Sequence, residues 1–196
     1  MPRLPPLRIE ELPPDLAAIV RSAEDYMGFV ANDALTMAWK PEMLRAALPF
    51  MRSIYREDKV SFALKRLVGM MASWSAGCGY CVAHTAHGAA RLGTSETKIA
   101  ALAAFETDPQ FTAAERAALR VARSAGQVPN AVSDVEWADL RAHFDAEQTV
   151  EIVAVIALFG FLNRWNATLA TELESSPLTF ASRVLRPSGW QSGPHG

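Results

Sequence analysis

Two cysteines, Cys78 and Cys81, are the only thiols in this chain of 196 residues, and they lie three positions apart. On a helical backbone this spacing places the two Cα atoms about 5 to 6 Å apart, which is within the range that a disulfide requires. Two thiols at this distance can bond reversibly to each other and so take part in redox reactions. The spacing therefore predicts redox chemistry.

The residues around the pair place it at the start of a helix. Ala76 and Gly77 form a break, and residues 82–92 have the composition of a helix that ends at Gly93. In a first turn, unpaired backbone amides and the positive end of the helix dipole favour a thiolate and lower a cysteine pKa from about 8.5 towards neutrality. Position in the helix therefore favours Cys78 as the stronger nucleophile.

Composition argues against several other classes of function. A net charge of -2, with acidic and basic residues mixed along the chain, offers no basic surface for nucleic acid. The longest apolar run, residues 152–162, is about half the length needed to cross a bilayer, so we expect a buried helix and no membrane partner. Residues 1–6 lack the apolar segment of a signal peptide, which predicts a cytoplasmic protein, where purely structural disulfides are rare.

Helix signals recur along the chain and alternating β-branched runs are absent, so the sequence predicts an all-α protein. Helices are expected after Asp15, over residues 32–39, from Pro41, and over residues 61–75. Further helix starts are predicted from caps or capping boxes at Thr94, at Thr112 with Glu115, at Ser133 with Glu136 and at Asp145 with Gln148. The last of these helices is expected to end near Leu173.

The domain organisation follows from length and composition. With 50% of its residues apolar, the chain can bury a core as a single all-helical domain over residues 1–186. We divide this domain into an N-terminal helical region, 1–60, and a core, 61–186, that carries the cysteine pair. Residues 187–196 are expected to form a flexible tail.

The segment around the cysteines resembles a known redox motif. Residues 78–84, preceded by Ser73 and Gly77, are similar to the motif of the alkylhydroperoxidase D and carboxymuconolactone decarboxylase superfamily. Residues 157–165 resemble a second signature, that of its peroxidase-related branch. The resemblance covers nearly the whole chain and implies an alkylhydroperoxidase D-like helical bundle that forms homo-oligomers.

The same resemblance implies an activity and a role for each cysteine. The dithiol would reduce an organic hydroperoxide, a peroxiredoxin-type antioxidant reaction, and a dithiol electron-donor protein would restore it. In this scheme Cys81 is the thiol that reacts with the peroxide, and Cys78 resolves the sulfenic acid into a disulfide. This order is opposite to the one that the helix position favours.

Two positions depart from the family pattern. Arg66 stands where active members carry a relay glutamate, and Thr85 stands where they carry a histidine. A positioned general base contributes about 10² to 10⁴ in rate, so the loss of both without a substitute would abolish useful turnover. His84 lies about 60° around the helix from Cys81 and is a candidate substitute, the alternative being a histidine bonded at a helix or subunit interface.

Two histidines also raise the question of a metal site. Cys78, Cys81, His84 and His87 recur at intervals of three and are residue types that bind zinc. Each step of three turns the side chain by about 60°, so the first and last members face opposite sides of one helix. We therefore predict no metal and no cofactor.

Three functions remain after these observations. The first is a thiol-dependent hydroperoxide reductase that uses Cys78, Cys81 and His84. The second is a noncatalytic or redox-sensing oligomer of the same fold that has lost the glutamate and histidine relay. The third, a lactone decarboxylase, uses acid and base groups without a redox thiol pair, and the cysteine pair argues against it.

Overall fold

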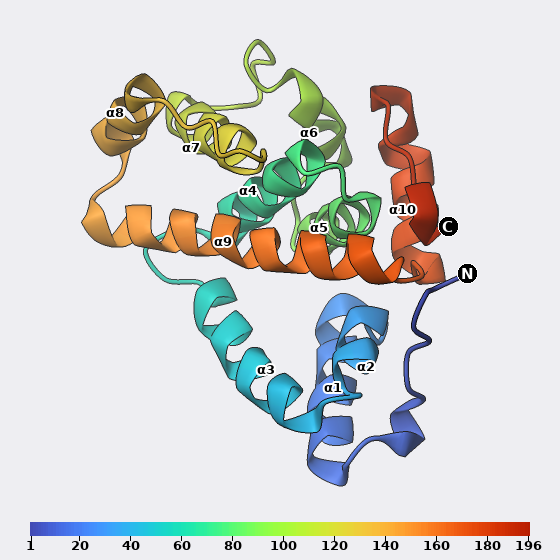
Figure 1. The fold of residues 1–196 in the computed structure, drawn as a ribbon. Coiled ribbons are helices and arrows are strands. Elements are labelled where there is room, and N and C mark those ends of the chain that lie inside the picture. Colours follow the sequence, from blue (N-terminus) through green and yellow to red (C-terminus); the bar gives the residue numbers. More distant parts are fainter.

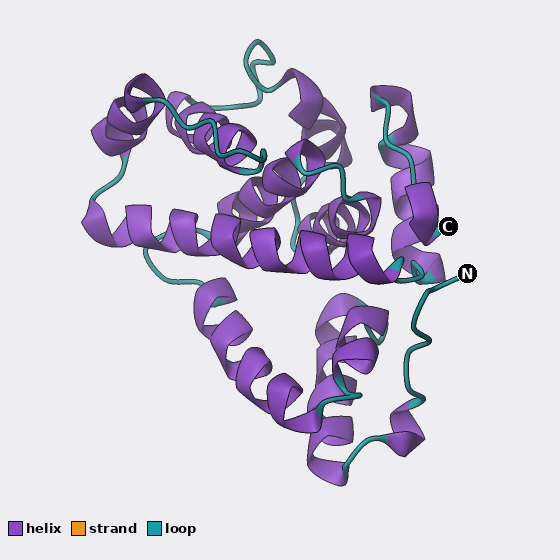
Figure 2. Cartoon of the chain, viewed as in Figure 1, coloured by secondary structure: helices purple, strands orange, loops and turns teal.

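The computed structural model describes the backbone of residues 1–196 and every side chain except that of Tyr26. The described chain is built of helices, with no strand (Figure 2), which confirms the all-α prediction. In chain order the elements are η1 (Ile9–Glu11), α1 (Pro14–Met27), α2 (Asn32–Met37), α3 (Pro41–Tyr55), α4 (Phe62–Ser75), α5 (Gly79–Arg91), α6 (Glu96–Ala100), η2 (Ala101–Ala104), α7 (Ala113–Ala125), α8 (Asp134–His143), α9 (Ala146–Leu169), α10 (Ser175–Val184), η3 (Arg186–Ser188) and η4 (Gly193–His195).

The long helix α9 runs through the middle of the molecule (Figure 1). Helices α4, α5 and α7 lie on one side of it, around the larger apolar cluster, while α1, α2 and α3 lie on the other side, around a smaller one. Ile152 and Val155 of α9 belong to the larger cluster, and Leu162 and Trp165 pack against the smaller one. Because α9 serves both clusters, it is apolar around most of its circumference.

By length and composition alone α9 is apolar enough to cross a membrane, and 44% of its most apolar window is buried inside the fold. The apolar run at residues 152–162 therefore lies in a core helix, as the sequence predicts. The division of the domain at residue 60 stays a prediction.

The turn between α4 and α5 sets the cysteine pair in place. Ser61 caps α4 through a hydrogen bond of 3.3 Å from the Leu64 amide to its Oγ. After Ser75 the chain reverses at Gly77, whose φ of +71° favours a residue without a Cβ. Cys78 then forms the N-cap of α5, and its amide donates to the Ser73 carbonyl oxygen at 3.0 Å. The predicted break at this point is thus confirmed.

Capping signals located most helix starts. The capping boxes of α7, α8 and α9 begin at Thr112, Ser133 and Asp145, as predicted. The expected cap at Thr94 is wrong by one residue, because α6 starts at Glu96 and Ser95 accepts the Lys98 amide instead.

The end predicted for α9 near Leu173 is also wrong. The helix ends at Leu169, where Ala170 adopts a left-handed conformation with a φ of +49°. The Thr171 amide then donates to the Asn166 carbonyl oxygen at 3.1 Å, which closes the helix end in place of the glycine that usually does so.

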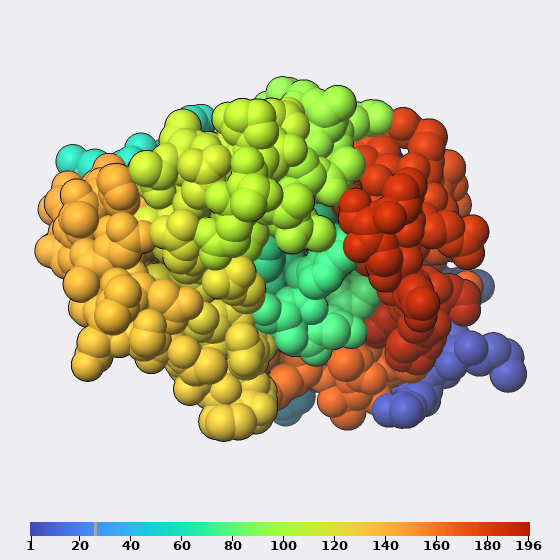
Figure 3. Space-filling model, turned by 90° about the horizontal axis from the view of Figure 1, so that it is seen from above, coloured from blue at the N-terminus to red at the C-terminus, as the bar shows by residue number. Residues whose placement is uncertain are grey.

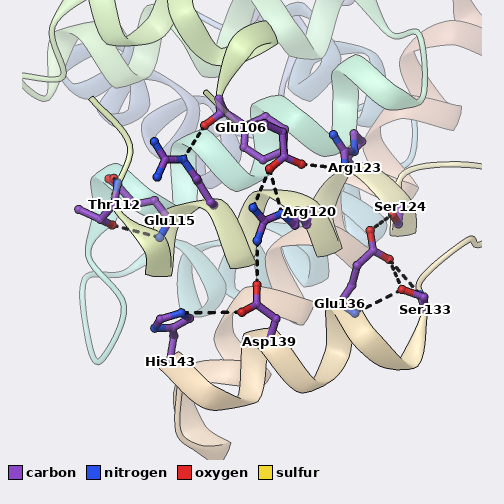
Figure 4. A network of polar contacts seen from close by, with 12 residues as sticks. Glu106, Thr112, Glu115, Arg120, Arg123, Ser124, Ser133, Glu136, Asp139 and His143 are labelled. Atoms are coloured by element: carbon purple, nitrogen blue, oxygen red, sulfur yellow. Dashed lines mark hydrogen bonds and ion pairs between the residues drawn. The ribbon is translucent and has the colours of Figure 1, made fainter. Parts of the chain in front are cut away.

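A network of ion pairs joins α8, α7 and the loop that precedes α7 (Figure 4). Arg120 of α7 contacts Glu106 at 2.7 Å and Asp139 of α8 at 2.9 Å, and Ser124 donates to Glu136 at 2.7 Å. These side chains are partly exposed, so each ion pair contributes about 0 to 1 kcal/mol. The network holds α8 to α7, which packs on α4, and is separate from the cysteine pair.

Candidate redox site

Cys78 and Cys81 are both free thiols, and both are buried, with 1% and 2% of their surfaces exposed. Cys78 is the N-cap residue of α5 and Cys81 lies in the first turn of the same helix. The two thiols lie close enough for each to shift the pKa of the other. The structure therefore brings the two sulfur atoms together, with neither open to solvent.

The two thiols differ in acidity. The pKa of Cys78 is lowered to about 5, chiefly by the hydrogen bond from Cys81; burial opposes this effect, and His195 and the Cys81 amide act in the same direction as Cys81. Burial raises the pKa of Cys81 well above its usual value, and the neighbouring Cys78 raises it further. Near neutral pH the pair thus holds one negative charge, on Cys78. This direction agrees with the helix position and differs from the order that the family resemblance implies.

A histidine from the far end of the chain completes the surroundings of Cys78. His195 is 2% exposed, and its Nδ1 lies 2.9 Å from the Thr171 carbonyl oxygen. Because a carbonyl oxygen only accepts, Nδ1 carries a proton, which leaves Nε2 as the ring nitrogen available to Cys78. The sequence carries no signal for this residue, since it lies in the segment expected to be a flexible tail.

Glu174, at the start of α10, has three hydrogen-bonding partners near the cysteine pair. Its Oε2 lies 2.5 Å from His84 Nε2, and its Oε1 accepts from the Tyr80 hydroxyl at 2.9 Å and from the Asn32 amide at 2.5 Å. Burial raises the pKa of Glu174, but the charge and hydrogen bond of His84 and the Asn32 amide outweigh it, so the pKa is lowered overall. The result is a buried carboxylate paired with an imidazole.

The ring of His84 is fixed from two sides as well. It stacks on the Tyr80 ring with centroids 4.1 Å apart and meets the Phe29 ring edge-on at 4.9 Å. The Tyr80 hydroxyl bonds Glu174 and accepts the Asp33 amide at 3.2 Å. Tyr80, which separates the two cysteines in sequence, thus orients the His84 and Glu174 pair.

Asn166 of α9 connects Cys81 to a second carboxyl group. Its Nδ2 lies 3.4 Å from Cys81 Sγ and 3.4 Å from Asp33 Oδ2. Burial raises the pKa of Asp33, with Glu174 acting in the same direction and His84 against it. A carboxyl group whose pKa is raised in this way can hold or release a proton close to the cysteine pair.

The two positions that depart from the family pattern serve packing. The Arg66 guanidinium lies over the rings of Tyr55 and Phe62, at 4.7 and 5.2 Å from their centroids. The Thr85 hydroxyl donates to the Cys81 carbonyl oxygen at 2.7 Å, within its own helix. The carboxylate and imidazole near the cysteines come instead from Glu174 and His84.

His87 stands apart from the other three residues of the zinc-like spacing. Its ring lies near Phe29 and Phe180, with centroids 5.6 and 5.8 Å away, and burial lowers its pKa. Over the described residues, no three His, Cys, Asp or Glu side chains are arranged to hold a metal ion.

Of the predicted site residues, Cys78 and Cys81 lie next to each other, whereas His84 Nε2 contacts Glu174. Four polar residues of the site carry little signal in the sequence, because tertiary packing alone brings them to α5: Asp33, Asn166, Glu174 and His195. Asn166 is the one with a usable signal, since it is a polar residue on the buried face of an otherwise apolar helix.

A large groove lies elsewhere on the molecule. It has a volume of about 1010 Å³ and runs between α9 and the helices α7 and α8, and neither cysteine is among its lining residues. Its apolar walls include Trp137, Val153, Phe161 and Trp165.

The chain is similar to known proteins both in sequence and in fold. Residues 41–124 match the carboxymuconolactone decarboxylase family. The debrominase Bmp8 in its apo form has a TM-score of 0.85 and 31% identity, covering 92% of this chain and 97% of that one. A cysteine-to-alanine variant of Bmp8 in complex with 2,3,4-tribromopyrrole has a TM-score of 0.86. This chain belongs to the carboxymuconolactone decarboxylase family.

A peroxidase-related protein from Ralstonia eutropha JMP134 with an alkylhydroperoxidase D core has a TM-score of 0.80 at 22% identity, covering 92% of this chain and 95% of that one. This structural similarity shows that the chain has the alkylhydroperoxidase D-like fold. Among curated relatives, YnjA of Escherichia coli (strain K12) is 35% identical over 92 residues, which are 47% of this chain and 50% of YnjA. The chain thus spans about half the length of that relative.

Proposed function

We propose that this chain is a thiol-dependent reductase in which Cys78 and Cys81 give two electrons to a small electrophile and form a disulfide. The observation that carries the proposal is the unequal acidity of the pair, with the pKa of Cys78 lowered to about 5 and that of Cys81 raised. A thiolate next to a protonated thiol is the state that attacks an electrophile and then closes a disulfide.

The substrate class we propose first is an organic hydroperoxide. The Cys78 thiolate attacks the terminal peroxide oxygen, the O–O bond breaks, and the alkoxide takes a proton from His84, which Glu174 holds in place. Cys78 is then a sulfenic acid and the substrate has become an alcohol. The Cys81 thiol attacks that sulfur, the disulfide forms, and the sulfenic oxygen leaves as water with the Cys81 proton.

Regeneration requires a second dithiol. A cytoplasmic electron-donor protein with such a pair would attack the disulfide, pass through a mixed disulfide and leave Cys78 and Cys81 reduced. The electrons balance, since each cycle oxidises one donor dithiol and reduces one hydroperoxide. The proposed cycle uses no other cofactor.

A halogenated aromatic ring is a second candidate substrate, supported by 31% identity to a debrominase across 92% of this chain. The Cys78 thiolate would take the halogen as the carbon–halogen bond breaks, and the ring carbon would take a proton. Cys81 would then displace the halide from sulfur and form the same disulfide. Both reactions use the same residues and the same two electrons.

A single experiment tests the proposal and separates the two substrates. The reduced protein is mixed with one equivalent of cumene hydroperoxide, or of a brominated pyrrole, and the disulfide is measured by mass spectrometry beside the alcohol or bromide released. We expect stoichiometric disulfide with one substrate, multiple turnovers with excess dithiothreitol, and no turnover in Cys78→Ser. Thiols that stay free in both mixtures would refute the proposal. One oxidation without turnover would support the redox-sensing alternative.

We also propose that the protein is a homo-oligomer that pairs through α9. Val150, Val153 and Phe161 on the outer face of α9 are 67%, 40% and 44% exposed. They lie three and eight residues apart along the helix, and Val153 and Phe161 line the large apolar groove. Exposed apolar stripes of this kind commonly mark an interface, and a twofold axis would let each copy cover the other's stripe.

A further inference from the structure

The buried thiols raise a question of access. With 1% and 2% of their surfaces exposed, neither Cys78 nor Cys81 can meet a substrate unless a covering segment moves. Residues 189–196 are one such cover, because they lie across the start of α5. In the space-filling view the red C-terminal segment flanks the blue-green segment that leads into the cysteine pair (Figure 3).

This covering segment, which we call the strap, touches α5 at its first residue. The Trp190 Nε1 donates to the Gly79 carbonyl oxygen at 3.1 Å. The carbonyl oxygens of Gln191 and Ser192 also lie so close to the Gly79 Cα that a Cβ there would collide with them. Gly79 follows Cys78 directly, so the strap packs on the backbone that carries the reactive sulfur.

The strap is held by two buried side chains and bends at two glycines. Trp190 and His195 are 6% and 2% exposed, whereas Gln191, Gly193 and Pro194 between them are exposed. Gly189 and Gly193 have φ values of +91° and +59°, which glycine adopts freely. A segment with two anchors and two glycine bends can open without disturbing the helices beneath it. The predicted flexibility of residues 187–196 stays a prediction.

His195, the second buried side chain that holds the strap, is also the strap residue that can bond Cys78. The His195 carbonyl oxygen accepts the Leu173 amide at 2.8 Å, and Nδ1 donates to the Thr171 carbonyl oxygen at 2.9 Å. The imidazole lies 5.8 Å from the Tyr80 ring between centroids. These contacts fix the ring at the start of α5 and leave Nε2 for the Cys78 sulfur.

We propose that His195 is a positioning residue, carried by the strap, whose protonated Nε2 donates to the Cys78 thiolate when the strap is closed and which withdraws when the strap opens. The proposal deepens the proposed function, on which it rests for the identity of the attacking thiol. The titratable groups that face Cys78 are Cys81 from α5 and His195 from η4, while α4 contributes the Ser73 carbonyl oxygen and the strap adds the neutral Trp190. The hydrogen bond to His195 is one of the causes that lower the pKa of Cys78.

The experiment follows thiolate formation directly and needs no substrate. Ultraviolet absorbance of the thiolate is titrated with pH in the wild type, in His195→Gln and in His195→Ala. We expect both variants to raise the titration midpoint by about one pH unit, the size of effect that one hydrogen-bonded charge has on a neighbour. Added imidazole should move the His195→Ala midpoint back towards that of the wild type. His143→Gln, a change on α8 remote from the site, should leave the midpoint unchanged.

A second measurement tests the strap. Trp190→Phe keeps the aromatic ring but loses the hydrogen bond to Gly79, which should favour the open strap. At a pH above the titration of Cys78, we therefore expect Cys78 to be alkylated about tenfold faster, a factor that corresponds to about 1.4 kcal/mol of lost closure free energy.

The His195 proposal is overturned if the titration midpoint stays at the wild-type value in both His195 variants while circular dichroism shows them folded. Should those variants not fold, deletion of residues 194–196, which keeps Trp190, must raise the midpoint in the same way. If it does not, the proposal is wrong. If Cys78 is alkylated no faster in Trp190→Phe than in the wild type, the proposed opening of the strap is wrong. All these results are independent of whether any hydroperoxide or aryl halide is reduced.

Discussion

Glu174 Oε2 and His84 Nε2 lie 2.5 Å apart, although the two residues are 90 positions apart in the chain. This pair supplies the carboxylate and the imidazole that are missing at the family's relay positions, where Arg66 and Thr85 stand. In the proposed function, the relay therefore comes from the start of α10 and the middle of α5. The departure at positions 66 and 85 does not by itself remove acid and base groups from the site.

Replacing Glu174 by Gln should lower the turnover of the reductase by about 10² or more, because His84 loses the carboxylate that orients it and supports its charge. The initial rate of cumene hydroperoxide consumption measures this effect. Glu172→Gln is a matched control, since Glu172 is exposed two residues away. Equal rates in Glu174→Gln and wild type would rule out a role for the pair.

The order of the cysteines is a second prediction. Since Cys78 carries the thiolate, Cys81→Ser should accumulate a sulfenic acid on Cys78 after one equivalent of peroxide, because no thiol remains to resolve it. A dimedone adduct mapped by mass spectrometry identifies the labelled residue. Faster labelling of Cys81 in Cys78→Ser would restore the order that the family resemblance implies.

The acidity of Cys78 should also appear in the stability of the fold. The pKa of Cys78 is lowered to about 5 in the folded protein, whereas an unperturbed cysteine has a pKa of about 8.5. Between these values the unfolded chain binds more protons than the folded one, so stability rises with pH. The contribution is complete above the unfolded pKa and is lost as the pH falls through the folded value.

Urea unfolding of the wild type and of Cys78→Ser across this pH window measures the contribution. We expect the stability difference between the two proteins to grow in favour of the wild type from about pH 5 to about pH 8.5. Above that window Cys81, whose pKa is raised, acts in the opposite direction. A difference that does not change with pH would contradict the lowered pKa.

The sequence located the cysteine pair and most of the helices because their signals are local. A capping box such as Thr112 with Glu115 spans one helical turn, and the cysteine spacing is read along a single segment. Glu174 and His195 carry no such signal, since long-range packing alone brings them to α5. The end of α9 was missed for a related reason, because Ala170 takes the left-handed conformation that usually identifies a glycine.

Restoring the family residues should not restore or raise activity. In Arg66→Glu with Thr85→His, the buried guanidinium between Tyr55 and Phe62 is replaced by a carboxylate. Arg66 is 6% exposed, so a carboxylate at that position should destabilise the protein by about 2 to 4 kcal/mol. Arg52→Glu, at an exposed position of α3, is the control in urea unfolding. A double variant that is stable and turns over faster would show that the site lacks its relay.

The outer face of α9 provides the last prediction. In a single copy Val150, Val153 and Phe161 are exposed, and the last two line a groove of about 1010 Å³. This apolar exposure costs free energy in water and is removed when a second copy covers it. Light scattering during size-exclusion chromatography should therefore give a mass above that of one chain, and Val153→Glu should shift the protein to the monomer. Ala142→Glu, on the exposed side of α8, should leave the assembly intact. Because neither cysteine lines the groove, the Val153→Glu monomer should keep the Cys78 titration of the wild type, and a changed titration would mean that assembly shapes the redox site.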